Sequence, residues 1–232
     1  MFSYKPLFLV FSLLAFFTSP NDVESFNKER SSFGVPENLY FHVYRNGTKI
    51  GHHSVKFSKS KDVLLNVDIN IFLNVKFLGI NIYKYMHQNN EKWKYSSNKN
   101  TSDLKFISLS TTTNINDEII FCNEKIELYE NEKYIFPTSY WNSSFLKRDL
   151  FSLEVYNTQD CNFFDLKVKK LADEKIYNKS LTASRYKLFG ETSQGNVLDI
   201  DIWYDKTGKW VKMIFLKDGS EIKYILDEYH EK

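Results

Sequence analysis

The strongest constraint on the fold is an alternation of apolar and polar residues with a period of two. From Leu65 to Phe77 every odd-numbered residue is apolar, while asparagine, aspartate and lysine fill most of the even-numbered positions. This period is typical of a β-strand with one buried face and one solvated face. The thirteen residues would extend about 43 Å at roughly 3.3 Å each. Strands of that length are typical of strongly curved or barrel-like antiparallel sheets.

The same pattern recurs along the chain, with turn-forming residues between the segments. Asn46-Gly47 separates two alternating segments and predicts a two-residue hairpin turn. That turn places Phe41 opposite His52, so that His42 and His53 share one face. The predicted strands cover residues 39–44, 49–57, 65–77, 80–93, 104–113, 111–116, 119–129, 163–171, 182–189, 197–204, 210–216 and 221–226.

These segments predict an all-β fold in which short links join antiparallel neighbours into a meander. An open flat sheet of so many strands would expose two long edges, so we expect the meander to curl into a barrel or half-barrel. Only residues 139–151 depart from the pattern, and they predict one short helix or loop. The composition has no break and the chain has no internal repeat, so we expect a single β domain over residues 39–232.

The first 25 residues have the features of a secretory signal peptide. Lys5 precedes an apolar run from Leu7 to Phe17 that is interrupted only by Ser12, and Pro20 follows. As a helix this run would span only about half of a bilayer core. We therefore predict a signal peptide at 1–25, a flexible segment at 26–38 and no transmembrane helix in the mature chain. An uncleaved N-terminal anchor helix is the alternative.

Two cysteines, Cys122 and Cys161, remain after that segment. Export brings a chain into an oxidising compartment, where a disulfide between them can form. The alternative is two separate buried thiols, because the sequence does not show whether the two Cα atoms come within bridging distance.

Six short blocks occur in a recognisable order along the chain. They are GTKIGHHSV (47–55), YKYMHQNNEKW (83–93), FPTSYWN (136–142), NTQD (157–160), RYKLFG (185–190) and DIWYDKTGKWVKM (201–213). In these blocks the chain resembles domain of unknown function family 6134, an uncharacterised family of exported bacterial proteins. The resemblance covers residues 39–226, with Tyr85-x-His87 plus Trp93, Tyr140-Trp141-Asn142 and Trp203-Tyr204-Asp205 as its most specific parts. It implies an exported bacterial β protein with no known activity. With the signal peptide predicted at 1–25, we expect the protein in the periplasm of a Gram-negative bacterium.

Sites for nucleic acids, cofactors or metals are not indicated by the sequence. The 31 basic residues nearly balance the 29 acidic ones, which argues against a nucleic-acid binder. Gly-rich phosphate loops and a G-x-S-x-G elbow are absent, so we expect no cofactor. His42 and His53 alone do not make a metal site, and we predict none. Asp199 and Asp201 fit a solvated strand face better than an acid/base pair.

Aromatic residues are the one marked excess, at 17% of the chain. Most of them will form the core, but some can line the concave face or mouth of a barrel, as in apolar-ligand pockets. The candidate ligand-binding residues are Tyr85, His87, Trp93, Tyr140, Trp141, Asn142, Arg185, Trp203 and Tyr204. The leading hypothesis is a non-catalytic envelope protein that binds or carries a lipid or another apolar ligand. The alternatives are a hydrolase centred on His87 and a scaffold that binds another envelope protein.

Overall fold

The strands of this chain join one continuous sheet. The computed structural model describes residues 35–60, 64–95, 104–125, 135–147, 153–192, 195 and 197–229. Within these residues, thirteen strands pair in the order β6-β5-β4-β3-β2-β1-β13-β12-β11-β10-β9-β8-β7. The elements are β1 (Leu39–Arg45), β2 (Thr48–Lys59), β3 (Leu64–Phe77), β4 (Ile80–Tyr95), β5 (Leu104–Ile115), β6 (Glu118–Lys125), β7 (Phe136–Pro137), η1 (Ser143–Lys147), β8 (Leu153–Tyr156), β9 (Phe163–Ile176), β10 (Leu181–Thr192), β11 (Val197–Asp205), β12 (Trp210–Lys217), β13 (Ser220–Leu226) and η2 (Asp227–Tyr229).

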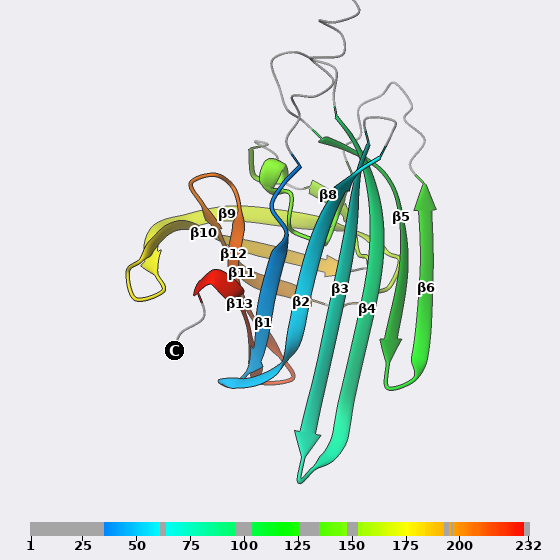
Figure 1. The fold of residues 1–232 in the computed structure, drawn as a ribbon, viewed down its shortest axis with the longest axis vertical. Helices are drawn as coiled ribbons and strands as arrows, with labels where there is room; N and C mark the ends of the chain where they lie inside the picture. Colours follow the sequence, from blue (N-terminus) through cyan, green and yellow to red (C-terminus); the bar gives the residue numbers. More distant parts are fainter. Residues whose placement is uncertain are drawn as a thin grey trace, which may run out of the picture. The chain divides into compact units, whose positions relative to one another are not determined.

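The predicted all-β fold is confirmed, including the curled meander (Figure 1). The sheet is not closed, because its two terminal strands, β6 and β7, do not pair with each other in the described residues. The short helix or loop expected near 139–151 is the 3-10 helix η1. The predicted signal peptide and most of the segment 26–38 lie outside the described residues.

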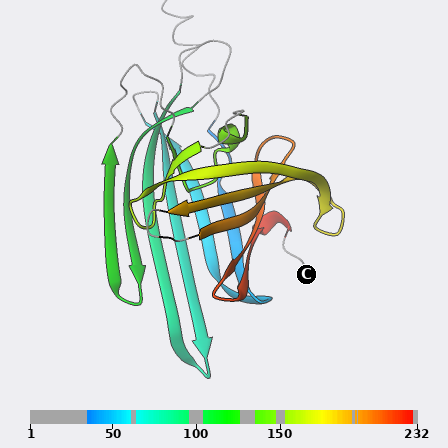
Figure 2. The same ribbon diagram turned by 180° about the vertical axis from the view of Figure 1, so that it is seen from behind.

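The sheet consists of two meanders that share one junction. Strands β1 to β6 pair in sequence order, as do strands β8 to β13, and β1 pairs with β13 to join the two series. All of these pairs are antiparallel; β7 and β8 pair in parallel. In both views the strands β9 and β10 run across the direction of β3 and β4 (Figures 1 and 2). The inner faces of the two meanders therefore form a common core.

The predicted register of the first hairpin is wrong by one residue. The structure pairs Phe41 with His53 and His42 with His52, and a bulge follows Val43. Ile50 is the extra residue of the bulge, and its side chain is buried. His42 consequently shares a face with His52 rather than with His53. The bulge lies beside Gly51, where an added Cβ would collide with the carbonyl oxygen of Phe72 on β3.

Aromatic rings from the two meanders meet in the core. The ring centroids of Phe41 on β1 and Trp210 on β12 are 4.1 Å apart. The segment that contains η1 also spans both meanders. Its Trp141 packs against Trp93 of β4 at 5.1 Å, and its Phe145 packs against Tyr204 of β11 at 6.3 Å.

Candidate functional site

A cavity of about 300 Å³ lies between strands β2–β4 and strands β12–β13. Its apolar wall consists of Ile50, Ile71, Leu73, Val75, Phe215 and Ile222. Three tyrosines, Tyr83, Tyr85 and Tyr224, and four polar residues, Arg45, Gln159, Lys217 and Asp218, complete the lining. Ligand pockets in proteins share this composition of apolar walls with a few polar groups, and their volumes begin at about this size.

Exposure distinguishes the inner end of the cavity from its rim. Tyr85 and Tyr224 are each only 5% exposed, whereas the side chains of Lys217 and Asp218 are 71% and 82% exposed. Arg45 is positioned beside them by a hydrogen bond from its Nε to the Ser220 hydroxyl at 2.9 Å. The cavity is thus apolar and aromatic inside and charged at its rim.

Tyr85 supplies an unpaired polar group at the inner end. Period-two alternation places Tyr83, Tyr85 and His87 in one row on β4, with ring centroids 6.5 Å and 6.3 Å apart. The Tyr85 hydroxyl is buried and has no hydrogen-bond partner among the described residues. Burial, with a smaller contribution from Tyr224, raises the pKa of Tyr85 well above its usual value. This phenol is therefore neutral and can both donate and accept a hydrogen bond.

Two buried histidines lie on either side of Ile71, which lines the cavity. Ile71 of β3 pairs with His53 of β2 on one side and with His87 of β4 on the other. Burial lowers the pKa of His53 to about 3 and that of His87 to about 4, and the proximity of His87 contributes to the shift of His53. Both rings are consequently neutral at pH 7.

His87 contacts two threonine hydroxyls. Its Nδ1 lies 2.9 Å from the hydroxyl of Thr113, and its Nε2 lies 3.4 Å from that of Thr158. The ring is 2% exposed and does not line the cavity. These contacts hold β4 against β5 and against the segment that follows β8.

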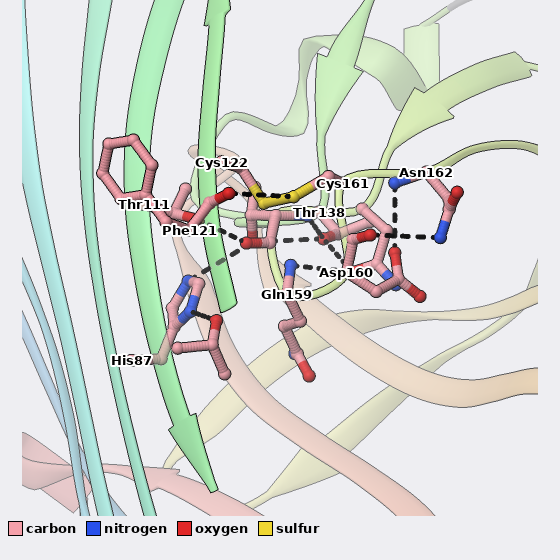
Figure 3. Close-up of a disulfide and its surroundings, with 12 residues drawn as sticks. His87, Thr111, Phe121, Cys122, Thr138, Gln159, Asp160, Cys161 and Asn162 are labelled. Carbon is pink, nitrogen blue, oxygen red and sulfur yellow. Dashed lines mark hydrogen bonds between the residues drawn. A yellow bond between two sulfur atoms is a disulfide. The ribbon is translucent and has the colours of Figure 1, made fainter. Parts of the chain in front are cut away.

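A disulfide fixes that same segment to the edge of the sheet (Figure 3). Cys122 of β6 is bonded to Cys161, 39 positions later, with 5.6 Å between the Cα atoms. Nearby, the Thr111 hydroxyl donates to the carbonyl oxygen of Thr158 at 2.9 Å. Gln159 of this segment lines the cavity. The disulfide therefore secures a part of the cavity wall.

Glu91 is a buried carboxylate that sequence reasoning did not single out. It is 1% exposed and accepts hydrogen bonds from the indole N–H groups of Trp93 at 2.8 Å and Trp141 at 3.0 Å. The Asn89 amide also donates to it at 2.8 Å. Burial raises the pKa of Glu91, and the hydrogen bonds oppose that rise. The signal was present in the sequence, since alternation places Asn89 and Glu91 on the inward face between His87 and Trp93.

Of the candidate ligand-binding residues, the structure places Tyr85 in the cavity and the others elsewhere. Trp93 and Trp141 donate their indole N–H groups to Glu91. The side-chain oxygen of Asn142 accepts a hydrogen bond from the backbone N–H of Ser144 at the start of η1. The Tyr204 hydroxyl donates to the carbonyl oxygen of Tyr140 at 2.8 Å.

Arg185 and Trp203 belong to a charged network on β10 and β11. Arg185 lies over the Trp203 ring at 5.1 Å, and the Trp203 indole N–H donates to Glu174 at 3.0 Å. Arg185 and Lys187 form ion pairs with Asp201, and Lys187 also pairs with Asp199. Asp199 and Asp201 therefore belong to a polar face of β11, where they pair with basic side chains of β10.

The described residues show neither a cluster of metal ligands nor a membrane-spanning helix. Among the described residues, no group of three histidine, cysteine, aspartate or glutamate side chains is arranged to hold a metal ion. In that same part of the chain, no helix has the length and hydropathy needed to cross a membrane.

Comparison with known proteins identifies the family and the fold. No curated protein matches this sequence. A crystal structure of a beta-barrel-like protein of domain of unknown function DUF1849 from Brucella abortus is similar in fold, with a TM-score of 0.54 and 8% identity over 83% of this chain and 95% of that one. A DUF1329 family protein from Desulfovibrio piger aligns over 89% of each chain at 13% identity, but its TM-score is only 0.19. The model of the family described as domain of unknown function DUF6134 matches residues 41–227, and the chain belongs to that family.

Proposed function

We propose that this chain is an exported protein of the bacterial envelope that binds or carries an apolar or amphipathic ligand, such as a lipid, without catalysing a reaction. The observation that carries the proposal is the cavity with its apolar wall and charged rim. The signal-peptide-like sequence at 1–25 supports export to a Gram-negative periplasm.

The size and chemistry of the cavity suit one modest apolar group. An engineered cavity of about 150 Å³ holds benzene, so about 300 Å³ would hold on the order of twelve carbon atoms. The Tyr85 hydroxyl offers a hydrogen bond to a polar atom at the inner end. Arg45 and Lys217 at the rim would favour a polar or anionic head group at the entrance.

Native mass spectrometry after gentle purification tests this proposal. The expected spectrum contains a fraction of the chain with the added mass of a lipid or another apolar compound. A chain that repeatedly emerges ligand-free would count against the proposal, and it would be abandoned if an added fluorescent fatty acid also failed to bind.

A cavity-filling variant localises the binding. Val75→Trp introduces a large ring into the cavity wall and should abolish binding of the fluorescent fatty acid. Val197→Trp makes the same change at a residue that is 61% exposed and outside the cavity, and it should bind as the wild type does. Equal binding by both variants would place the ligand elsewhere.

The alternative is a hydrolase that uses His87 with a nearby carboxylate or hydroxyl as general acid and base. The hydroxyls of Thr113 and Thr158 lie beside the ring nitrogens, as that alternative requires. The carrier is preferred because His87 is 2% exposed and is not among the residues that line the cavity.

A further inference from the structure

The β3–β4 hairpin extends beyond the strands on either side of it. β2 pairs with β3 only as far as Leu73, and β5 pairs with β4 only from Tyr85 onward. The Lys84 N–H donates to Oδ1 of Asn116 at 2.8 Å, and the Lys84 carbonyl oxygen accepts the Asn116 N–H at 3.0 Å. Residues 74–83 therefore form a two-stranded ribbon without a paired neighbour in the described part of the chain. Both ribbon views show this hairpin reaching past the adjacent turns (Figures 1 and 2).

The ribbon presents large aliphatic side chains to solvent. Leu78 is 87% exposed, Ile80 69% and Ile82 54%. An isolated two-stranded hairpin is only marginally stable in water, and clustered exposed apolar side chains are typical of interaction sites. The folded chain gains little stability from these three residues in their exposed positions.

Leu78 is also an unfavourable residue for its backbone conformation. It begins the turn with φ of 48°, in the left-handed region, where a bulky side chain is rare. The corresponding turn positions in three other hairpins hold Asn46, Asn116 and Asp218, the residue types that tolerate this conformation. Leucine at this tip therefore costs conformational energy, and no packing contact within the hairpin offsets that cost because the side chain is exposed.

Within the sequence of the hairpin itself, the charges have one sign. From Ile69 to Asn90 the sequence contains no aspartate or glutamate, and its only charged side chains are Lys76 and Lys84. Both lysines are exposed and flank the apolar tip. An apolar tip between two cations is complementary to an anionic lipid surface, which offers acyl chains below a layer of negative head groups.

We infer that the ribbon tip inserts Leu78 and Ile80 into the surface of an anionic lipid bilayer while Lys76 and Lys84 contact its head groups. Val75 and Tyr83, at the base of the ribbon, line the cavity. Docking through the tip thus brings the cavity entrance close to the membrane. The inference rests on the ribbon alone and does not require that the cavity hold a lipid.

Vesicle flotation measures the docking. The full chain should bind vesicles of phosphatidylglycerol and phosphatidylcholine, and Leu78→Asp should bind about tenfold more weakly because it removes an inserted side chain and adds a negative charge. Replacing each lysine by glutamine should weaken binding about fivefold. The control Leu171→Asp makes the same change at an exposed residue of β9 and should bind as the wild type does. Equal binding by Leu78→Asp and Leu171→Asp would overturn the inference.

A fluorescent probe at the tip distinguishes binding through the tip from binding through the apolar run at residues 7–17, which can bind vesicles by itself. In Leu78→Trp the new indole should be quenched by lipids with brominated acyl chains, whereas the indole of Leu171→Trp should not. The four native tryptophans are buried and provide a constant background. Equal quenching of the two new indoles, or none, would overturn the inference. Sedimentation without lipid is a further test. If Leu78→Asp sediments differently from the wild type in the absence of lipid, the tip is a contact between copies of the chain, and the inference is overturned.

Discussion

Trp141 donates its indole N–H to the Glu91 carboxylate at 3.0 Å, across 50 positions of sequence. The bond joins the segment before η1 to β4, and Trp93 donates to the same oxygen. Because all three side chains are buried, neither indole N–H has water as a substitute partner.

Glu91→Ala should therefore be strongly destabilising. The substitution leaves two buried indole N–H groups unpaired and should lower the free energy of unfolding by about 3 kcal/mol or more. Glu91→Gln should cost less, because the amide oxygen can still accept both bonds. Urea unfolding followed by circular dichroism measures the loss. The control is Glu191→Ala, an exposed position on β10 where a change within about 0.5 kcal/mol is expected. Equal stability of the two alanine variants would contradict the structural role of Glu91.

Acid should destabilise the fold through His53. Its folded pKa of about 3 lies below the ordinary histidine pKa of 6.5. As the pH falls from 6.5 towards 3, the unfolded chain therefore binds a proton that the folded chain excludes. Stability should decline by up to about 1.4 kcal/mol per pH unit within that window. The lowered pKa of His87 acts in the same direction.

His53→Phe should remove the contribution of His53 to this pH dependence. Phenylalanine suits the site, where the ring packs against Phe41 and Trp210 and neither ring nitrogen has a partner in the described residues. Thermal unfolding at pH 5 and pH 8 tests this expectation. The control Val55→Ala, on the same strand face, should lower stability equally at both pH values. An unchanged pH slope in His53→Phe would show that other groups cause the acid sensitivity.

Loss of the disulfide should destabilise the chain and loosen the cavity wall. Closing a loop with a sequence separation of 39 stabilises a fold by about 4 kcal/mol in the chain-entropy model. The double variant Cys122→Ala/Cys161→Ala should therefore have a free energy of unfolding lower by up to about 4 kcal/mol. It should also exchange amide hydrogens faster around Gln159. A reducing agent should reproduce this effect in the wild type and have none on the double variant; an effect on both would show that the agent acts elsewhere.

Tyr85→Phe should weaken ligand binding without lowering the stability of the fold. The hydroxyl has no partner in the described residues, so its removal should leave stability unchanged or raise it by up to about 1 kcal/mol. Affinity for a ligand that places a polar atom beside it should fall by roughly fivefold. Tyr204→Phe is the matched control, because it removes a hydrogen bond to Tyr140 and should lower stability by about 1 kcal/mol. A fluorescent fatty acid titration and thermal unfolding give the two readouts.

Most strands were predictable because the alternation is local, but the segments 104–113 and 111–116 form the single strand β5, and β7 and β8 were not predicted. The predicted strand 65–77 is β3 nearly residue for residue, and the turns at Asn46, Asn116 and Asp218 lie where their residue types indicate. The register at His42 was not predictable, because the bulge at Ile50 depends on how closely β2 approaches β3 beside Gly51. No spacing rule within one hairpin contains that information.

The cavity was only partly predictable for a related reason. Tyr85 and Trp93 belong to one inward row on β4, yet Tyr85 lines the cavity and Trp93 is packed in the core. The difference depends on what lies opposite each residue: β13 near Tyr85, through Tyr224, and the η1 segment near Trp93, through Trp141. These partners come from distant parts of the sequence, so a pattern along β4 cannot distinguish the two environments.

The pairing of β1 with β13 determines when the sheet can be completed. Phe41 lies beside Leu226 in the middle of the strand order, so the two meanders become continuous only after the ribosome has added residue 226. Until then each half exposes a long unpaired edge, and loop closure over so many residues is slow. Until residue 226 has been made, a nascent chain of this protein thus cannot complete the sheet around its core.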